Sequence, residues 1–180
     1  MFKVIAHPTD FSEESALAFY HALALALRHG SRLDILLEVK LPHAATPIMA
    51  GMQIGVVLGL IGAVAGCLDG EAIITTDVGQ HQMWVAQAYP LERSRQWLTS
   101  GGLGTMGFGM PAAIGAALAC PERTVVCFSG DGSLLMNLQE LATAVECGAN
   151  IKIIVMNNES LGLVHQQQTL FYGKRIFASR

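Results

Sequence analysis

One stretch of the sequence, residues 130–158, constrains the fold more than any other. It begins with a Gly-Asp-Gly turn, continues in a helical pattern over residues 134–147, and passes through an apolar run at 151–156 into two asparagines. A turn after a strand, a crossover helix and a second strand make a parallel β-α-β unit. The carboxyl ends of parallel strands gather at one edge of a sheet, where ligands bind. We therefore expect Asp131 and Asn158 to lie close together.

The chemistry of these two side chains indicates a ligand. A carboxylate oxygen from Asp131 and an amide oxygen from Asn158 suit a hard cation such as Mg²⁺. The start of the helix after Asp131 suits a phosphate group, because its first peptide N–H groups lack intrahelical partners. The residues alone thus predict a site that holds a metal ion and a diphosphate.

Composition narrows the class of protein. Of the 180 residues, 52% are hydrophobic and only 14% are charged, which is low for a soluble domain and predicts extensive burial in the core or against partners. The net charge of −3, without a basic run, argues against a nucleic-acid partner. The four cysteines form no C-x-x-C pair, so we expect free, buried thiols in a reducing cytoplasm.

The first 39 residues predict a short β-α-β unit of their own. Residues 2–6 form an apolar run, a helical pattern begins near Ser12, and residues 33–39 form a second strand-like run. The segment Pro8-Thr9-Asp10-Phe11-Ser12, with Arg28-His29-Gly30, resembles the start of a universal stress protein. In that family the region of Asp10 helps to hold an adenine nucleotide. No glycine-rich phosphate loop follows here, which favours a truncated unit without a ligand over a nucleotide-binding module.

Residues 40–53 contain two prolines and mixed polarity, and we expect a junction there. The apolar run over residues 48–68 is long enough for a transmembrane helix. Basic anchors on its flanks are missing, however, and an acidic Asp-Gly-Glu follows it. A helix docked on a globular sheet is therefore the favoured interpretation, and a membrane anchor is the alternative.

The remaining two thirds alternates strands with helices, which predicts a doubly wound, mostly parallel α/β sheet. The expected strands are residues 72–76, 96–99, 125–128 and 151–156, and one expected helix covers 111–120. The segment 101–109, with five glycines, follows the second of these strands. Glycines let a backbone approach a flat ligand closely, so we expect this segment at the same sheet edge as Asp131.

A second resemblance rests on several motifs in order. They are Thr76-Asp77-Val78-Gly79-Gln80-His81-Gln82-Met83-Trp84, Ser100-Gly101-Gly102-Leu103-Gly104-Thr105-Met106-Gly107, Pro111-Ala112-Ala113-Ile114-Gly115-Ala116, Gly130-Asp131-Gly132 and Asn157-Asn158. The last two are similar to the signature of thiamine diphosphate enzymes. Together the motifs resemble the large, catalytic subunit of acetolactate synthase over about residues 54–173. The resemblance implies an incomplete thiamine diphosphate-binding domain at 54–180, preceded by a short β-α-β unit at 1–39.

This resemblance implies roles for individual residues. Mg²⁺ would be bound by the side chains of Asp131 and Asn158 and by the backbone oxygen of Ser160. The residues implied in cofactor binding, mainly at the diphosphate, are Gly79, Gln80, His81, Gly130, Gly132 and Ser133. The Gly104 carbonyl would accept the pyrimidine amino group, and Met106 would wedge between the two cofactor rings. Gln167 would lie in the substrate region, where many members of the family have tryptophan.

The resemblance also implies a reaction and a protein domain, needed for that reaction, that this sequence does not contain. The family decarboxylates pyruvate and transfers the two-carbon unit to a second 2-oxo acid. Its catalytic glutamate lies on a separate N-terminal domain and is contributed across a dimer interface. That domain has no counterpart in this sequence. We therefore expect no catalytic residue in the chain, little activity alone, and a homodimer or the missing domains in trans.

Overall fold

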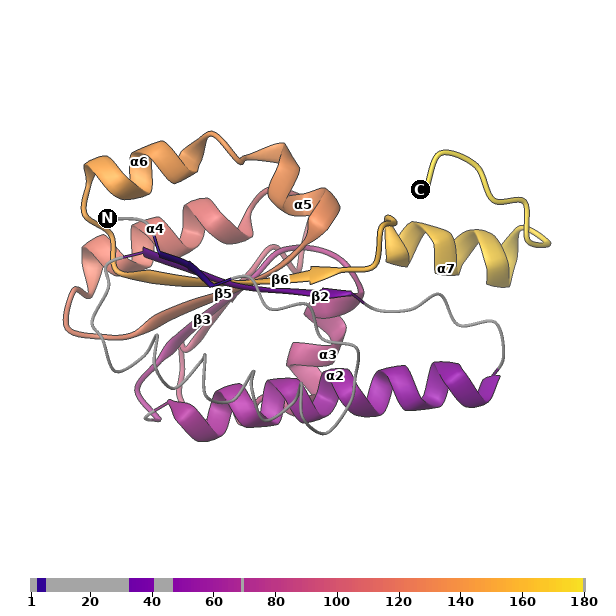
Figure 1. The fold of residues 1–180 in the computed structure, drawn as a ribbon, viewed down its shortest axis with the longest axis horizontal. Coiled ribbons are helices and arrows are strands. Elements are labelled where there is room, and N and C mark those ends of the chain that lie inside the picture. Colours follow the sequence, from indigo (N-terminus) through magenta and orange to yellow (C-terminus); the bar gives the residue numbers. More distant parts are fainter. Residues whose placement is uncertain (1–2, 6–32, 41–46, 69, 180) are drawn as a thin grey trace.

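The computed structural model describes residues 3–5, 33–40, 47–68 and 70–179 (Figure 1). The expected helix near Ser12 and the candidate nucleotide contact Asp10 lie outside the described residues.

The described strands form a six-stranded sheet in which every neighbouring pair is parallel. Its order is β1-β2-β6-β5-β3-β4. The strands are β1 (Lys3–Ile5), β2 (Leu33–Lys40), β3 (Ile73–Thr76), β4 (Trp97–Thr99), β5 (Val125–Gly130) and β6 (Ile151–Asn157). The expected parallel α/β fold is confirmed. The chain moves from β3 to the edge strand β4 and then returns to the other side of β3, which creates the switch point where such sheets bind ligands.

The amino-terminal strands belong to the same sheet as the rest of the chain. β2 pairs in parallel with β6, from Leu33 opposite Ile151 to Lys40 opposite Asn157. Helix α2 begins at Pro47, so the second half of the expected junction at 40–53 is helical and not an irregular linker. The proline stands at the first helical position, where its missing N–H costs no hydrogen bond.

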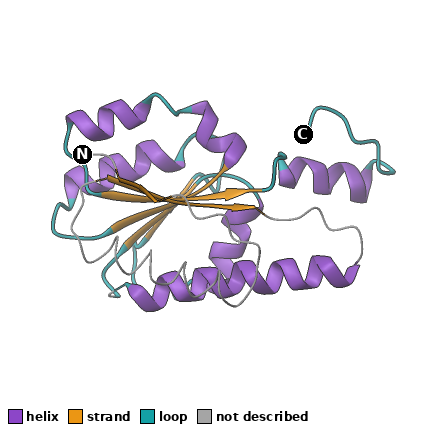
Figure 2. Ribbon diagram, in the orientation of Figure 1, coloured by secondary structure: helices purple, strands orange, loops and turns teal. Residues whose placement is uncertain are grey.

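Helices cover both faces of the sheet (Figures 1 and 2). They are α2 (Pro47–Cys67), α3 (Gln80–Ala88), α4 (Gly109–Ala119), α5 (Asp131–Met136), α6 (Glu140–Glu146) and α7 (Gly162–Phe171). In Figure 1, α4, α5 and α6 lie above the sheet, whereas α2 and α3 lie below it. α7 extends beyond the carboxyl end of β6.

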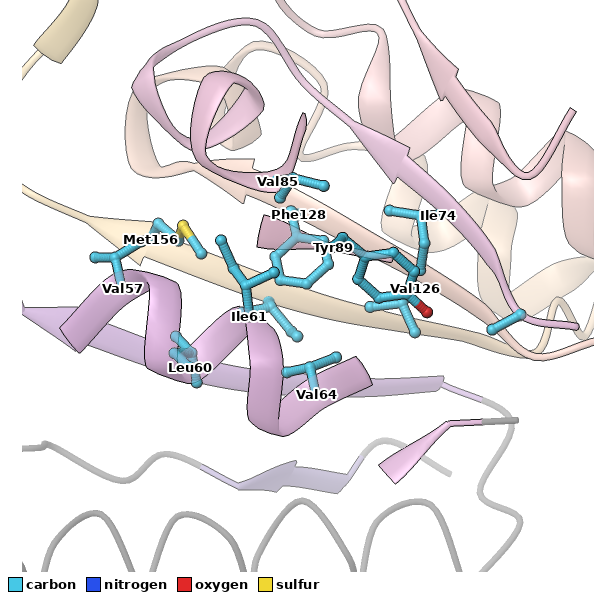
Figure 3. Close-up of a cluster of buried hydrophobic side chains, with 12 residues drawn as sticks. Val57, Leu60, Ile61, Val64, Ile74, Val85, Tyr89, Val126, Phe128 and Met156 are labelled. Carbon is cyan, nitrogen blue, oxygen red and sulfur yellow. The ribbon is translucent and has the colours of Figure 1, made fainter. Parts of the chain in front are cut away.

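Side chains of α2 and α3 pack against one face of the sheet (Figure 3). Val57, Ile61 and Val64 of α2 are almost completely buried. They share a cluster with Val126 and Phe128 of β5. The expectation that the apolar run docks on a sheet is therefore confirmed. Across the described ranges, we find no helix with the length and hydropathy needed to cross a membrane.

Alternate residues of the same strands point to the opposite face. Val125 and Cys127 of β5 and Ile153 of β6 pack with Met110 and Ala113 of α4. Burial on both faces explains why these strands read as continuous apolar runs and not as alternating patterns.

The single helix expected over residues 134–147 is wrong. Two short helices, α5 and α6, occupy this stretch with a break between them. The side-chain amide of Asn137 donates a hydrogen bond to the carbonyl of Gly107, 30 positions earlier in the chain. This contact holds the chain where α5 ends, and the apolar periodicity of the segment could not reveal it.

Docking of α2 predicts unequal effects of substitution on its two sides. Ile61→Ala should lower the free energy of unfolding by about 2–5 kcal/mol, because it leaves a cavity in the core. Gly59→Ala, at an exposed position where a Cβ meets no atom within 4 Å, should raise it by about 0.5–1 kcal/mol. Denaturant unfolding measures both values. An unchanged free energy of unfolding in Ile61→Ala would contradict the docking of this helix.

Candidate functional site

A pocket opens at the carboxyl edge of the sheet, at the switch point. Among the described residues, its lining comes from the segments that follow β3, β5 and β6 and from the first turns of α3, α5 and α7. Gly104 and Met106 of the glycine-rich segment complete the wall. The sheet thus brings four segments that are distant in the sequence to one place.

The pocket collects nearly all of the residues singled out in the sequence. Those that line it are Gly79, Gln80, His81, Gly104, Met106, Gly130, Asp131, Gly132, Ser133, Asn158 and Ser160. Gln167 does not line it and is exposed on α7. The neighbouring residue Gln166 instead contacts the pocket lining. The side-chain oxygen of Gln166 accepts a hydrogen bond from Gln80 Nε2 at 3.0 Å.

Asp131 lies half-buried at the first position of α5. Partial burial raises the pKa of its carboxyl, because the charged form loses hydration, and the nearby Glu159 adds to this rise. Hydrogen bonds from backbone groups of Asp131, Asn158 and Gly132 oppose the rise. A cation beside Asp131 would relieve both the lost hydration and the repulsion from Glu159.

Asn158 is oriented by its neighbours. Its side-chain nitrogen donates to Gln80 Oε1 at 3.4 Å, and its side-chain oxygen accepts the Ser160 N–H at 3.2 Å. Because a carbonyl oxygen has two lone pairs, this oxygen can still bind a cation. Among the described residues, no group of three or more His, Cys, Asp and Glu is placed to hold a metal ion. A metal at this edge therefore depends on a mixed set of carboxylate, amide and backbone oxygens.

Glycines give the pocket its shape by close approach. A Cβ at Gly130 would come within 3.1 Å of the His81 ring, and one at Gly132 would lie 2.7 Å from Leu161 Cδ2. At Gly162, which the sequence analysis missed, a Cβ would lie 2.3 Å from Gln80 Oε1. A larger residue at any of these positions would displace the pocket lining. The absence of Cβ atoms lets these side chains pack directly against the backbone of the pocket wall.

His81 is buried, and its Nε2 atom has no hydrogen-bond partner among the described residues. Burial lowers the pKa of its imidazole to about 4, although the charge and backbone of Asp77 act in the opposite direction. The ring is therefore neutral near pH 7. An unpartnered buried nitrogen in a pocket is a polar group that a ligand can satisfy.

Asp77 is a further residue that the sequence analysis missed. It directly follows β3, and only 1% of its surface is exposed. Its carboxylate accepts hydrogen bonds from the peptide N–H groups of Val78, Gly107 and Gly109 at 2.8, 2.9 and 2.8 Å. An acid at a strand end beside a glycine-rich segment was the available signal, but only the fold shows that the two meet.

The buried state of His81 predicts a specific dependence of stability on pH. Its pKa is about 4 in the folded protein and 6.5 as the reference value, so the unfolded chain binds the proton more readily. This stabilising contribution is complete above pH 6.5 and is lost as the pH falls toward 4. The loss amounts to about 3 kcal/mol. Urea unfolding of the wild type and His81→Asn should show a steeper decline for the wild type, and parallel profiles would contradict the assignment.

Comparisons with known proteins agree with this geometry. The family described as "Thiamine pyrophosphate enzyme, C-terminal TPP binding domain" matches residues 77–180. The chain is 75% identical over 121 residues to acetolactate synthase isozyme 1 large subunit of Escherichia coli, covering 67% of this chain and 22% of that protein. It is 59% identical over 107 residues to the acetolactate synthase large subunit of Lactococcus lactis, covering 59% and 19%.

A third relative is about as similar as the protein of Lactococcus lactis. Acetolactate synthase 2, chloroplastic, of Brassica napus is 58% identical over 104 residues, which cover 58% of this chain and 16% of that protein. The chain thus spans about a fifth of the length of these curated relatives. The resemblance to acetolactate synthase large subunits is confirmed, and so is thiamine diphosphate (thiamine pyrophosphate) with Mg²⁺ as the cofactor pair of the family. Since the family match covers more than half of its residues, the chain belongs to the thiamine pyrophosphate enzymes, within their C-terminal cofactor-binding domain.

Proposed function

We propose that this chain is the thiamine diphosphate- and Mg²⁺-binding portion of an acetolactate synthase-like carboligase. The observation that carries the proposal is the pocket, where a carboxylate, an amide oxygen, a buried unpartnered imidazole nitrogen and the backbone of Gly130 and Gly132 lie together. A metal ion with a diphosphate satisfies all four features, whereas an apolar ligand would leave the polar groups unpaired.

The residues divide into a metal side and a phosphate side. Asp131 and the side chain of Asn158 would hold Mg²⁺, with the Ser160 carbonyl as a third ligand. The phosphate groups would receive hydrogen bonds from Gln80, Ser133 and the N–H of Gly132. We assign His81 to this side, since its buried Nε2 has no partner in the part of the chain that the structure describes. If it carries the proton on that nitrogen, it can donate a hydrogen bond to a phosphate oxygen.

The other end of the cofactor would meet the glycine-rich segment. Gly104 adopts a left-handed backbone conformation with φ +73°, which favours glycine and sets the direction of its carbonyl. The half-buried Met106 side chain lines the same wall, where it can separate two rings. Bound thiamine diphosphate supplies the nucleophilic carbon and the electron sink of the reaction, and this chain supplies binding and orientation.

The complete reaction needs groups beyond this pocket. Among the described residues that line it there is no glutamate. We propose that the catalytic glutamate comes from another domain or a second chain. This proposal agrees with the comparison, in which the match covers only 22% of the length of the Escherichia coli relative. Pyruvate and a second 2-oxo acid would be the substrates of that complete assembly. The assembly would act in the cytoplasm. Gln167 remains a candidate for contact with the second substrate.

Cofactor binding is the direct test of this function. Titration calorimetry should show thiamine diphosphate binding that requires Mg²⁺, and no comparable binding of ATP. Asp131→Ala should weaken the Mg²⁺-dependent binding at least 100-fold, or about 3 kcal/mol. The reason is that Asp131 is the one charged group among the three proposed metal ligands.

Glu159→Gln is the matched control. Glu159 is exposed and lies beside Asp131 in space, but it has no proposed role as a ligand. Its replacement should change the affinity only a few-fold. Wild-type affinity in Asp131→Ala would show that the metal binds elsewhere, and a wild type without affinity for the cofactor would overturn the proposed function.

A further inference from the structure

The glycine-rich segment, residues 101–109, is fastened to the sheet at its carboxyl end by one buried side chain. The Asp77 carboxylate accepts the Gly107 N–H on Oδ1 and the Gly109 N–H on Oδ2, at 2.9 and 2.8 Å. These bonds join positions 30 and 32 residues apart in the sequence. Oδ1 also accepts the N–H of Val78, at the start of the turn that leads to α3.

The surroundings of these bonds leave little room for another arrangement. A Cβ at Gly109 would lie 2.7 Å from the Asp77 nitrogen, so the two backbones are in direct contact. Thr75 Oγ1 donates a hydrogen bond to the Gly109 carbonyl at 2.9 Å, and Asn137 donates to the Gly107 carbonyl. Gly107 has a φ of +86°, a left-handed conformation that L side chains rarely adopt.

Only the carboxyl-terminal end of the segment is held in this way. Toward its other end, the bonds are local ones to Ser100, whose backbone oxygen accepts from Gly104 and whose hydroxyl accepts from Thr105. Gly104 and Thr105 are exposed, whereas Gly107 and Gly109 are buried. The position of the pocket wall at Gly104 and Met106 therefore depends on the bonds at Gly107 and Gly109.

We propose that Asp77 is a positioning residue, which holds segment 101–109 so that Gly104 and Met106 face the thiamine half of the cofactor. The inference rests on the proposed function. It predicts different effects on the binding of the thiamine half and of the diphosphate half of the cofactor. The groups proposed for Mg²⁺ belong to other segments, whereas Gln80 and His81 of the diphosphate side lie in the turn after Asp77, which the Val78 N–H ties to Oδ1. A variant that keeps an oxygen for Val78 but loses the bond to Gly109 should therefore weaken binding of the thiamine half more than binding of the diphosphate half.

Asp77→Asn is the informative variant because it keeps the shape of the side chain. Its amide oxygen can still accept from Val78 and Gly107, but its NH₂ group then faces the N–H of Gly109, so two donors meet. The affinity for thiamine diphosphate with Mg²⁺ should fall 10- to 100-fold. The affinity for inorganic diphosphate with Mg²⁺, measured by the same calorimetry, should stay within about two-fold of the wild type. Asp77→Ala, which loses the bonds to Gly107 and Val78 as well, should lower the affinity for both ligands, because the turn with Gln80 and His81 is then also released.

Amide hydrogen exchange tests the same idea without any cofactor. In Asp77→Asn, the exchange of the Gly109 N–H should quicken at least 10-fold, while amides in the core strand β5 keep their protection. A second variant, Asn137→Ala, loosens Gly107 from the opposite side and leaves the 77–81 turn untouched. It should likewise lower the affinity for thiamine diphosphate more than that for diphosphate.

The controls separate this inference from the function on which it rests. Asp131→Asn, in the proposed metal site, should lose affinity for both ligands together. A wild type that binds neither ligand would overturn the proposed function. A wild type that binds both, with Asp77→Asn losing both equally or losing neither, would overturn the positioning role while the proposed function stands.

Discussion

The structure depends on one constraint, the meeting of parallel strand ends at a switch point where backbones come unusually close. Parallel pairing of β3, β5 and β6 places Asp77, Asp131 and Asn158 at the same edge, although each follows a different strand. Close approach then requires glycine, as the contact of Gly109 with Asp77 shows. The same lack of Cβ atoms lets side chains of the pocket, such as His81 beside Gly130, pack directly against the backbone.

Helices cover both faces of the sheet, and this packing supports the site at its edge. α2 and α3 bury one face of β5 and β6, and α4 buries the other. At this edge, backbone N–H groups fix the carboxylate of Asp77, and side-chain partners orient Gln80 and Asn158. A buried carboxylate that accepts several hydrogen bonds destabilises the fold less than an unpaired one, and here it joins the end of β3 to the glycine-rich segment.

The sequence predicted the parts that depend on local pattern. The apolar runs at residues 72–76, 125–128 and 151–156 correspond to β3, β5 and β6. The motifs at the ends of these runs contain most of the residues that line the pocket. The failures involve contacts that no local pattern encodes. The break at Asn137 follows from its bond to Gly107, and the importance of Asp77 follows from two bonds across about thirty residues. The pairing of β2 with β6 likewise depends on the tertiary arrangement.

The central claim is that the carboxyl edge holds a metal ion together with the diphosphate of the cofactor. Paramagnetic broadening of amide signals by Mn²⁺, used in place of Mg²⁺, locates a bound ion directly. We predict that broadening in the presence of thiamine diphosphate centres on residues 131–133 and 158–160, and that it weakens when the cofactor is withdrawn. Broadening centred on another part of the chain, or unaffected by the cofactor, would contradict the account.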